Sequence, residues 1–148
     1  MAAAEPKKDP VGVNGIKVLN NYVYYTSSTK QLFCRVKVDS QGSAIGPYET
    51  IVNSGQPMDD FSLTKDRTAY IATYNKNSII KVTPHGQLST VVGGPNSTIL
   101  AGLASCQFSR KSDDVLYVVT SGAVRYPVNG IFTEPAKVAA VRLQGTKY

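Results

Sequence analysis

The sequence has few of the residues that would place it in several common functional classes. It contains no run of about eighteen apolar residues, so it has no candidate transmembrane helix and we expect no membrane contact. Its only histidine, His85, lies in a Pro-His-Gly turn, so no Ser-His-Asp or Cys-His catalytic group is expected. The two cysteines, Cys34 and Cys106, lack CxxC spacing and lie in apolar strand-like runs, which favours buried free thiols over a disulfide.

Positive charge is in excess, but the basic residues are spread along the chain. Sixteen Lys and Arg against ten Asp and Glu give a net charge of +6. The only adjacent basic pairs are Lys7-Lys8 and Arg110-Lys111, so the pattern indicates a solvated surface and we expect no nucleic-acid partner. The first ten residues lack the apolar core of a secretory signal. We therefore expect a cytoplasmic protein, or a secreted one if an N-terminal half precedes this chain.

A repeat of about 47 residues is the strongest pattern in the chain. Three strand-like runs that end in threonine occupy residues 22–26, 69–73 and 116–120. Each run follows one strand-like stretch and precedes another, and the first two repeats have a fourth at 48–52 and 88–92. Gly or Pro interrupts every interval long enough for a helix. The pattern therefore predicts short strands and no α-helix.

Four short strands in a repeat of this length are typical of a β-propeller blade. We predict an all-β fold of three blades, half of a six-bladed ring, at about residues 12–55, 56–101 and 102–148, after a flexible arm at 1–11. The last blade is predicted to be incomplete, because it carries an insertion at 121–135 and has no fourth strand. We expect this insertion and the loop around residues 96–98 to line the mouth of the central channel.

Three blades do not close a propeller, so the first and last blades would each expose an apolar face. An exposed patch of that size implies a partner. Two interpretations remain open: two copies pair as a homodimer that completes a six-bladed ring, or the chain is the C-terminal half of a longer protein. The missing fourth strand favours the second, because it leaves an unprotected sheet edge.

Several short motifs, taken together in order, resemble the second half of the regucalcin/gluconolactonase family of six-bladed propellers. They are Val13-Asn14-Gly15-Ile16, Tyr24-Tyr25-Thr26, Pro57-Met58-Asp59-Asp60-Phe61, and the runs at 69–73, 104–108 and 116–120. Residues 93–102 and 127–130 are more similar to the fungal branch that includes hetero-Diels–Alderases. This resemblance implies a biosynthetic enzyme that binds a small-molecule substrate and orients a reactive diene and an alkene for cycloaddition.

The resemblance also implies a metal site and a second activity. Hydrolytic family members hold a divalent cation at the ring centre with a Glu, an Asn and an Asp, and the Asn and Asp motifs map onto Asn14 and Asp59. Such oxygen ligands suit calcium or magnesium. The Glu has no counterpart here, because the blade that would supply it is absent. A metal-dependent lactone hydrolase is therefore the alternative activity, whereas a cycloaddition needs no cofactor.

The candidate substrate-binding residues are Asn14, Asp59, Asp60 and Ser105, and no catalytic residue is assigned. Asn14 precedes Gly15, so a tight turn is its alternative role. Asp59 and Asp60 precede the next innermost strand, where alternation directs at least one of them to the channel; capping of a loop is the alternative. Ser105 lies in the corresponding motif of the third blade. A third possibility for the whole chain is a non-catalytic or truncated propeller fragment.

Overall fold

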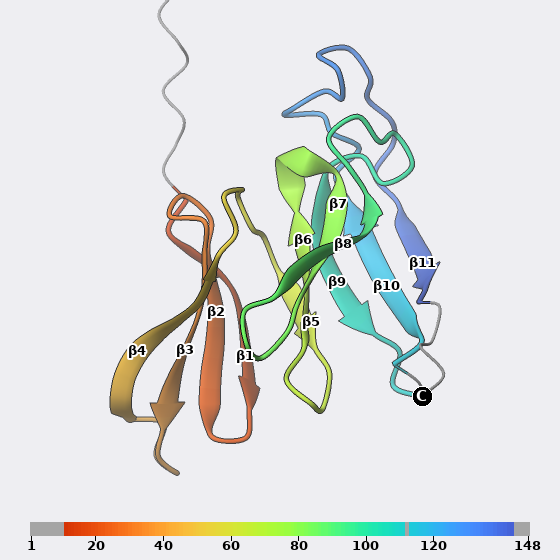
Figure 1. The fold of residues 1–148 in the computed structure, drawn as a ribbon. Coiled ribbons are helices and arrows are strands. Elements are labelled where there is room, and N and C mark those ends of the chain that lie inside the picture. Colours follow the sequence, from red (N-terminus) through yellow and green to blue (C-terminus); the bar gives the residue numbers. More distant parts are fainter. Residues whose placement is uncertain (1–10, 112, 144–148) are drawn as a thin grey trace, which may run out of the picture.

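The structure, a computed structural model, describes residues 11–111 and 113–143, and these residues form three antiparallel sheets (Figure 1). The first sheet consists of β1 (Val13–Leu19), β2 (Tyr22–Ser27), β3 (Leu32–Val38) and β4 (Ala44–Asn53). The second consists of β5 (Phe61–Leu63), β6 (Ala69–Thr73), β7 (Ser78–Val82) and β8 (Leu88–Gly93). The third consists of β9 (Leu103–Phe108), β10 (Val115–Thr120) and β11 (Val138–Arg142). One 3-10 turn, η1 (Tyr74–Lys76), follows β6.

These sheets confirm the prediction of an all-β fold with three blades, the last of which has three strands in the described residues. The predicted boundaries at 55 and 101 fall between β4 and β5 and between β8 and β9. The predicted arm at 1–11 lies outside the described residues except for Val11, as do residues 144–148 of the last blade. No helix among the described residues has the length and apolar character needed to cross a bilayer.

The three sheets stand side by side, with their first strands adjacent (Figure 1). Strands β1, β5 and β9 are neighbours at the inner side, and each sheet then continues outward through consecutive antiparallel strands. In a propeller this inner position surrounds the central channel. The turns that follow β2, β6 and β10 lie at the upper end of the sheets in Figure 1.

Two layers of the core lie between adjacent blades, and a smaller cluster of Ala101, Ala123 and Val128 lies at the insertion. In the first layer, Tyr24 and Phe33 of the first sheet pack against a group from the second blade: Met58, Phe61, Ala69, Ile71, Ile80 and Val82. The rings of Phe33 and Phe61 meet edge to face at 5.0 Å. Tyr24 is buried in this layer, as expected from its position on the strand face opposite Tyr25.

The second layer joins the second and third blades in the same way. Ala72 and Ile79 pack against a group from the third blade and its preceding loop: Leu100, Leu103, Cys106, Phe108, Leu116 and Val118. Tyr70 meets Phe108 edge to face at 5.2 Å. Cys34 and Cys106 are both free and buried, which confirms the expectation from the sequence.

Strand pairing corrects the alignment of the repeats. Tyr25 pairs with Ile16, Ile71 with Phe61, and Val118 with Cys106, so these three pairs occupy equivalent places in the blades. The equivalent residues Tyr25 and Ile71 are 46 positions apart, whereas Ile71 and Val118 are 47 apart. Although the threonines that end the three runs are evenly spaced in sequence, Thr26 is therefore not the structural equivalent of Thr73.

Candidate functional site

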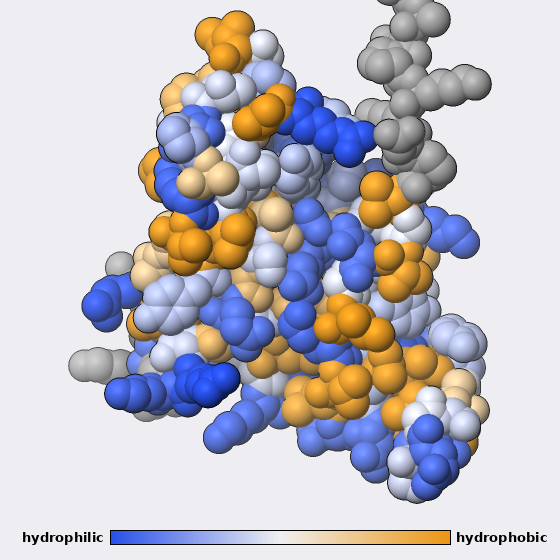
Figure 2. Space-filling model, turned by 180° about the vertical axis from the view of Figure 1, so that it is seen from behind, coloured by the Kyte–Doolittle hydropathy of each residue, from blue (hydrophilic) through white to orange (hydrophobic). Residues whose placement is uncertain are grey.

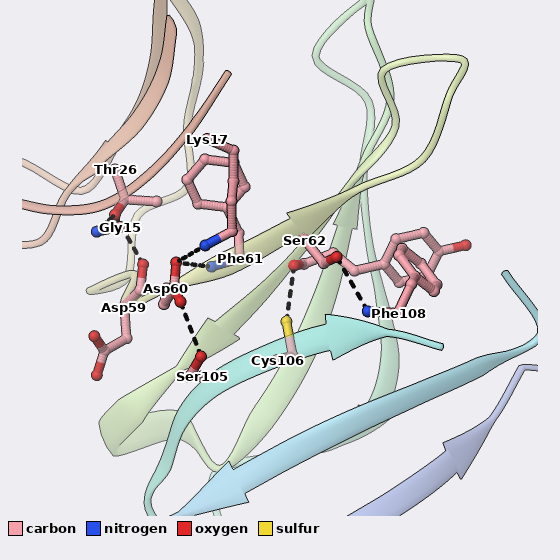
Figure 3. Close-up of polar contacts among 11 residues, drawn as sticks. Gly15, Lys17, Thr26, Asp59, Asp60, Phe61, Ser62, Ser105, Cys106 and Phe108 are labelled. Atoms are coloured by element: carbon pink, nitrogen blue, oxygen red, sulfur yellow. Dashed lines mark hydrogen bonds and ion pairs between the residues drawn. The ribbon is translucent and has the colours of Figure 1, made fainter. Parts of the chain in front are cut away.

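Asp59 and Asp60 immediately precede β5 and lie where the three blades meet (Figure 3). The backbone of Asp59 donates to Ala72 O at 2.8 Å, and that of Asp60 donates to Ala104 O at 3.3 Å. Because neighbouring residues on an extended chain point in opposite directions, the two carboxylates enter different surroundings.

Asp60 belongs to a cluster that connects all three blades, which we call the hub cluster: Lys17, Asp60 and Ser105. Lys17 Nζ of β1 lies 2.9 Å from Asp60 Oδ1, and Ser105 Oγ of β9 donates to Asp60 Oδ2 at 2.8 Å. Asp60 Oδ1 also accepts the backbone N–H of Phe61 at 2.8 Å. Figure 3 shows these side chains converging on Asp60. Asp60 and Ser105 therefore connect the second blade to the first and third blades through polar contacts.

Asp59 faces a cavity of about 360 Å³, which we call the mouth pocket. The pocket is formed by residues of all three blades. Its lining consists of Val11, Asn14, Ser28, Thr29 and Gln31 from the first blade, Pro57, Met58, Asp59, Tyr74 and Asn75 from the second, and Arg125 and Tyr126 from the insertion. The predicted insertion therefore does line the mouth, whereas the loop at 96–98 contributes no lining residue.

Asn14 is held at this pocket by a chain of hydrogen bonds. It lies within β1, at the register irregularity, and not in the tight turn that its Asn-Gly pair suggested. Its Nδ2 donates to Ser28 Oγ at 3.1 Å, and Ser28 Oγ donates to Met58 O at 2.6 Å. These contacts connect the first blade to the segment that carries Asp59.

A second contact fixes the backbone beside Asp59. Thr26 Oγ1 accepts the N–H of Gly15 at 2.9 Å and donates to Asp59 O at 2.8 Å. Gly15 is required here, because a Cβ at this position would stand 2.7 Å from Asp60 Oδ1 and 2.8 Å from Asp60 Cα. The close approach of the first two blades therefore depends on a residue without a side chain.

Burial raises the pKa of the Asp59 carboxyl above its ordinary value. The nearby negative charge of Asp60 also raises this pKa, while hydrogen bonding from Asn14 lowers it, and the balance is upward. Asp59 therefore holds its proton more readily in the folded chain than in the unfolded chain.

The raised pKa leads to a prediction for the pH dependence of stability. Because the folded state binds the Asp59 proton more tightly, its stabilising effect is complete below the ordinary pKa of 3.8 and is lost as pH rises through the raised value. Asp59→Asn removes this titration. Urea unfolding from pH 3 to 7 should therefore show the variant gaining stability relative to the wild type as pH rises. A constant difference between the two proteins over this window would contradict the raised pKa.

The mouth pocket has an aromatic and cationic wall that the sequence did not single out. The rings of Tyr74 and Tyr126 meet edge to face at 5.9 Å, and the guanidinium of Arg125 lies 5.8 Å from the Tyr126 ring centre. Ser121 Oγ lies 3.2 Å from the Tyr74 hydroxyl oxygen and 3.2 Å from Gly102 O, and its single proton can serve only one of these two oxygens. Asn75 also lines this wall.

Neither histidine nor cysteine contributes a nucleophile or a base to the pocket. His85 is exposed in the turn between β7 and β8, as predicted. Burial raises the pKa of the Cys106 thiol to about 12, and its Sγ donates to Tyr70 O at 3.1 Å. Cys106 is therefore a core residue that remains protonated at neutral pH.

Of the predicted site residues, Asn14 and Asp59 line the same pocket, while Asp60 and Ser105 lie in the hub cluster. The metal prediction rests on the first two. Calcium takes about six to eight oxygen ligands and magnesium about six, waters included. The described residues contain no group of three or more Asp, Glu, His or Cys side chains arranged to hold an ion. Asn14 and Asp59 alone therefore do not fit a divalent cation, and no chemical step is assigned to one.

Comparison with known proteins supports the fold and leaves the activity open. No family model matches the sequence. A protein from Phoma sp., named "Putative hetero-Diels-Alderase", is 24% identical over 143 residues, which is 94% of this chain and 39% of that protein. The chain thus spans well under half of this curated relative.

Solved structures with the same fold are propellers of the kind implied by the sequence motifs. A luciferin-regenerating enzyme matches with a TM-score of 0.67 and 18% identity, over 90% of this chain and 47% of that one. A Xanthomonas campestris gluconolactonase matches at 0.63 and 11%, over 89% and 38%. Regucalcin from Agrobacterium tumefaciens matches at 0.60 and 16%, over 73% and 37%. The resemblance to regucalcin- and gluconolactonase-like propellers is therefore confirmed at the level of the fold.

Proposed function

We propose that the mouth pocket binds an electron-poor diene, such as an ortho-quinone methide, together with an alkene and orients the two for cycloaddition. The observation that carries the proposal is the composition of the pocket. It combines two tyrosine rings, apolar contacts from Pro57 and Met58, and several hydrogen-bond donors, without a nucleophile and base in contact. The likeness to the Phoma protein supports this choice of reaction.

A cycloaddition requires the protein only to position the two reactants and to place polar groups beside them. The diene and the alkene form two new σ bonds, to one carbon and to the carbonyl oxygen of the diene, and no atom leaves. No proton has to be transferred, so holding the partners in a reactive geometry supplies much of the rate increase. Donors directed at the carbonyl oxygen add to it, because negative charge builds up on that oxygen as the reaction proceeds.

The aromatic wall is the part of the pocket best suited to both tasks. The Tyr74 and Tyr126 rings offer flat surfaces on which a planar diene packs. The Tyr74 hydroxyl and the Arg125 guanidinium both carry polar hydrogens on the same wall, and Asn14 and Asp59 lie in the first- and second-blade parts of the lining.

The test is the rate and stereochemistry of product formation from an ortho-quinone methide, released in solution, and an electron-rich alkene. The wild type should accelerate formation of the chroman product and favour one stereoisomer over the reaction in buffer. Tyr74→Phe removes one donor and should lower the rate about tenfold, the value of one net hydrogen bond of about 1 to 1.5 kcal/mol.

The matched control is Tyr22→Phe, the same change in a side chain that does not line the pocket. It should leave the rate and the stereochemistry unchanged. The same rate and isomer ratio with the wild type as in buffer would reject the proposed reaction. Equal losses in the two phenylalanine variants would reject the assignment of Tyr74.

A second candidate is lactone hydrolysis, favoured by the presence of Asn14 and Asp59 in one pocket. If that reaction takes place here, a chelator and Asp59→Ala should each abolish hydrolysis of a sugar lactone. Because two oxygen-bearing side chains do not complete a cation site, we rank this candidate below cycloaddition. Hydrolysis that survives chelation would remove it.

A further inference from the structure

We propose that a second copy of this chain docks head to tail on the first, so that two half rings close one channel. The contact joins the open side of the third sheet in each copy to the open side of the first sheet in the other. The inference concerns assembly and does not depend on which reaction the pocket supports.

The open side of the first sheet is apolar, and we call it the leading face: Ile16, Val18, Val23, Tyr25, Cys34, Val36 and Tyr48. These residues are paired across β1 to β4, so they share one side of the sheet. Ile16 is 57% exposed, Val18 69% and Tyr48 71%, whereas Cys34 and Val36 in the middle of the sheet are buried. Figure 2 shows hydrophobic side chains gathered at the lower right, over this first sheet.

The same side of the other two sheets is where the core layers form. By strand pairing, Ile16 is equivalent to Phe61 and Cys106, and Val18 is equivalent to Leu63 and Phe108. All four equivalents pack in the layers between adjacent blades. The leading face of the first sheet is therefore a blade interface whose mate is not among residues 11–111 and 113–143.

The open side of the third sheet is the opposite half of the same interface, and we call it the trailing face: Tyr117, Val119 and Val138. Tyr117 is equivalent to Tyr24 and Tyr70, which pack in the two core layers. Val138 pairs with Val119 as Phe33 pairs with Thr26 and Ile79 with Ala72. Yet Tyr117 is 49%, Val119 44% and Val138 70% exposed.

Because the blades have equivalent residues, the contacts observed between adjacent blades predict which residues meet at the contact between two copies. Phe33 meets Phe61 within the chain, so Val138 should meet Ile16 of the second copy. Tyr70 meets Phe108, so Tyr117 should meet Val18 of the second copy. Both proposed pairs are apolar, as are the buried pairs they correspond to, which favours this mate over a partner of unrelated surface.

The geometry of the ring favours closure by two copies. The chain supplies three blades, and its match to the luciferin-regenerating enzyme uses 90% of this chain and 47% of that one, so three blades make about half a ring. Two half rings related by a twofold axis form two identical head-to-tail contacts and leave no free face. The three blades of one copy form only part of the channel wall, and the second copy would supply the rest.

The experiment is sedimentation of two charge variants, separately and mixed. The wild type should have a mass near twice 15.9 kDa. Val18→Glu and Tyr117→Lys should each be monomeric, because each places two unpaired charges in the two contacts of a homodimer. Their equimolar mixture should form a dimer, since Glu meets Lys at one contact and the unaltered residues meet at the other.

Both substitutions replace side chains that are exposed within one chain, and circular dichroism checks that each variant folds. Gln87→Glu, a new charge in the exposed turn between β7 and β8, is the matched control and should stay dimeric. A monomeric or aggregated wild type would overturn the proposal. So would a mixture that stays monomeric, because it would show that the leading face of one copy does not meet the trailing face of the other. Since the readout is mass, a failed activity assay would leave this result unaffected.

Discussion

Replacing Phe61 with alanine is expected to lower the free energy of unfolding by about 3 to 5 kcal/mol. The Phe61 side chain is fully buried between the first two blades, where its ring meets Phe33 at 5.0 Å. Lys17 Nζ also lies 5.6 Å from the centre of the Phe61 ring. The truncation therefore leaves a cavity in the layer that joins the blades and removes the contact under the hub cluster. Urea unfolding at one fixed protein concentration measures the effect, because association would otherwise shift the midpoint.

Ile131→Ala is the control for this prediction. Ile131 is 87% exposed in the insertion, so its truncation should change stability by less than about 0.5 kcal/mol. A loss below about 1 kcal/mol for Phe61→Ala would mean that the two blades do not depend on their shared layer. The side-by-side arrangement of the sheets would then be incorrect.

Asp60→Ala is expected to lower the free energy of unfolding by about 2 to 3 kcal/mol. It removes the acceptor for Lys17, for Ser105 and for the N–H of Phe61. The Lys17 and Asp60 side chains are 30% and 27% exposed, so water compensates part of the loss and keeps the cost below that of a fully buried ion pair. The same urea measurement gives the value.

Two further variants separate the role of Asp60 from a general effect of charge. Asp113→Ala removes the same charge from an exposed turn and should change stability by less than about 0.5 kcal/mol. Asp60→Asn retains one acceptor oxygen and should fall between the wild type and the alanine variant. If Asp60→Ala proves as mild as Asp113→Ala, the hub cluster does not hold the blades together.

The fold was accessible from the sequence because its information is local and repeated. Tyr24 and Tyr25 are adjacent in a strand, and alternation places one in the core layer and the other on the open face, as the structure bears out. The exact equivalence of the blades was not accessible, since it depends on how many residues separate the paired positions of the first two strands: Ile16 and Tyr25 in the first blade but Phe61 and Ile71 in the second. This difference offsets the first blade by one residue relative to the even spacing of the threonines.

The site was only partly accessible. The motifs indicated Asn14 and Asp59, which the structure brings to one pocket, but they also indicated Asp60 and Ser105, which lie in the hub cluster. Alternation shows that Asp59 and Asp60 diverge, while the side chains each one meets depend on how neighbouring blades are placed. Tyr74 and Asn75 were missed because they belong to a single 3-10 turn after β6, where no periodicity marks their direction. The insertion was expected at the mouth, but its individual residues Arg125 and Tyr126 were not identified.

The most direct test of a small-molecule site at the channel mouth is a titration of the ¹⁵N-labelled chain with chroman, the product skeleton of the proposed cycloaddition, followed by NMR. The account predicts saturable shifts of backbone signals at Asn14, Asp59, Tyr74, Asn75 and Tyr126, the residues that line the mouth pocket. Shifts confined to the leading or trailing face, or no saturable shift at all, would contradict it.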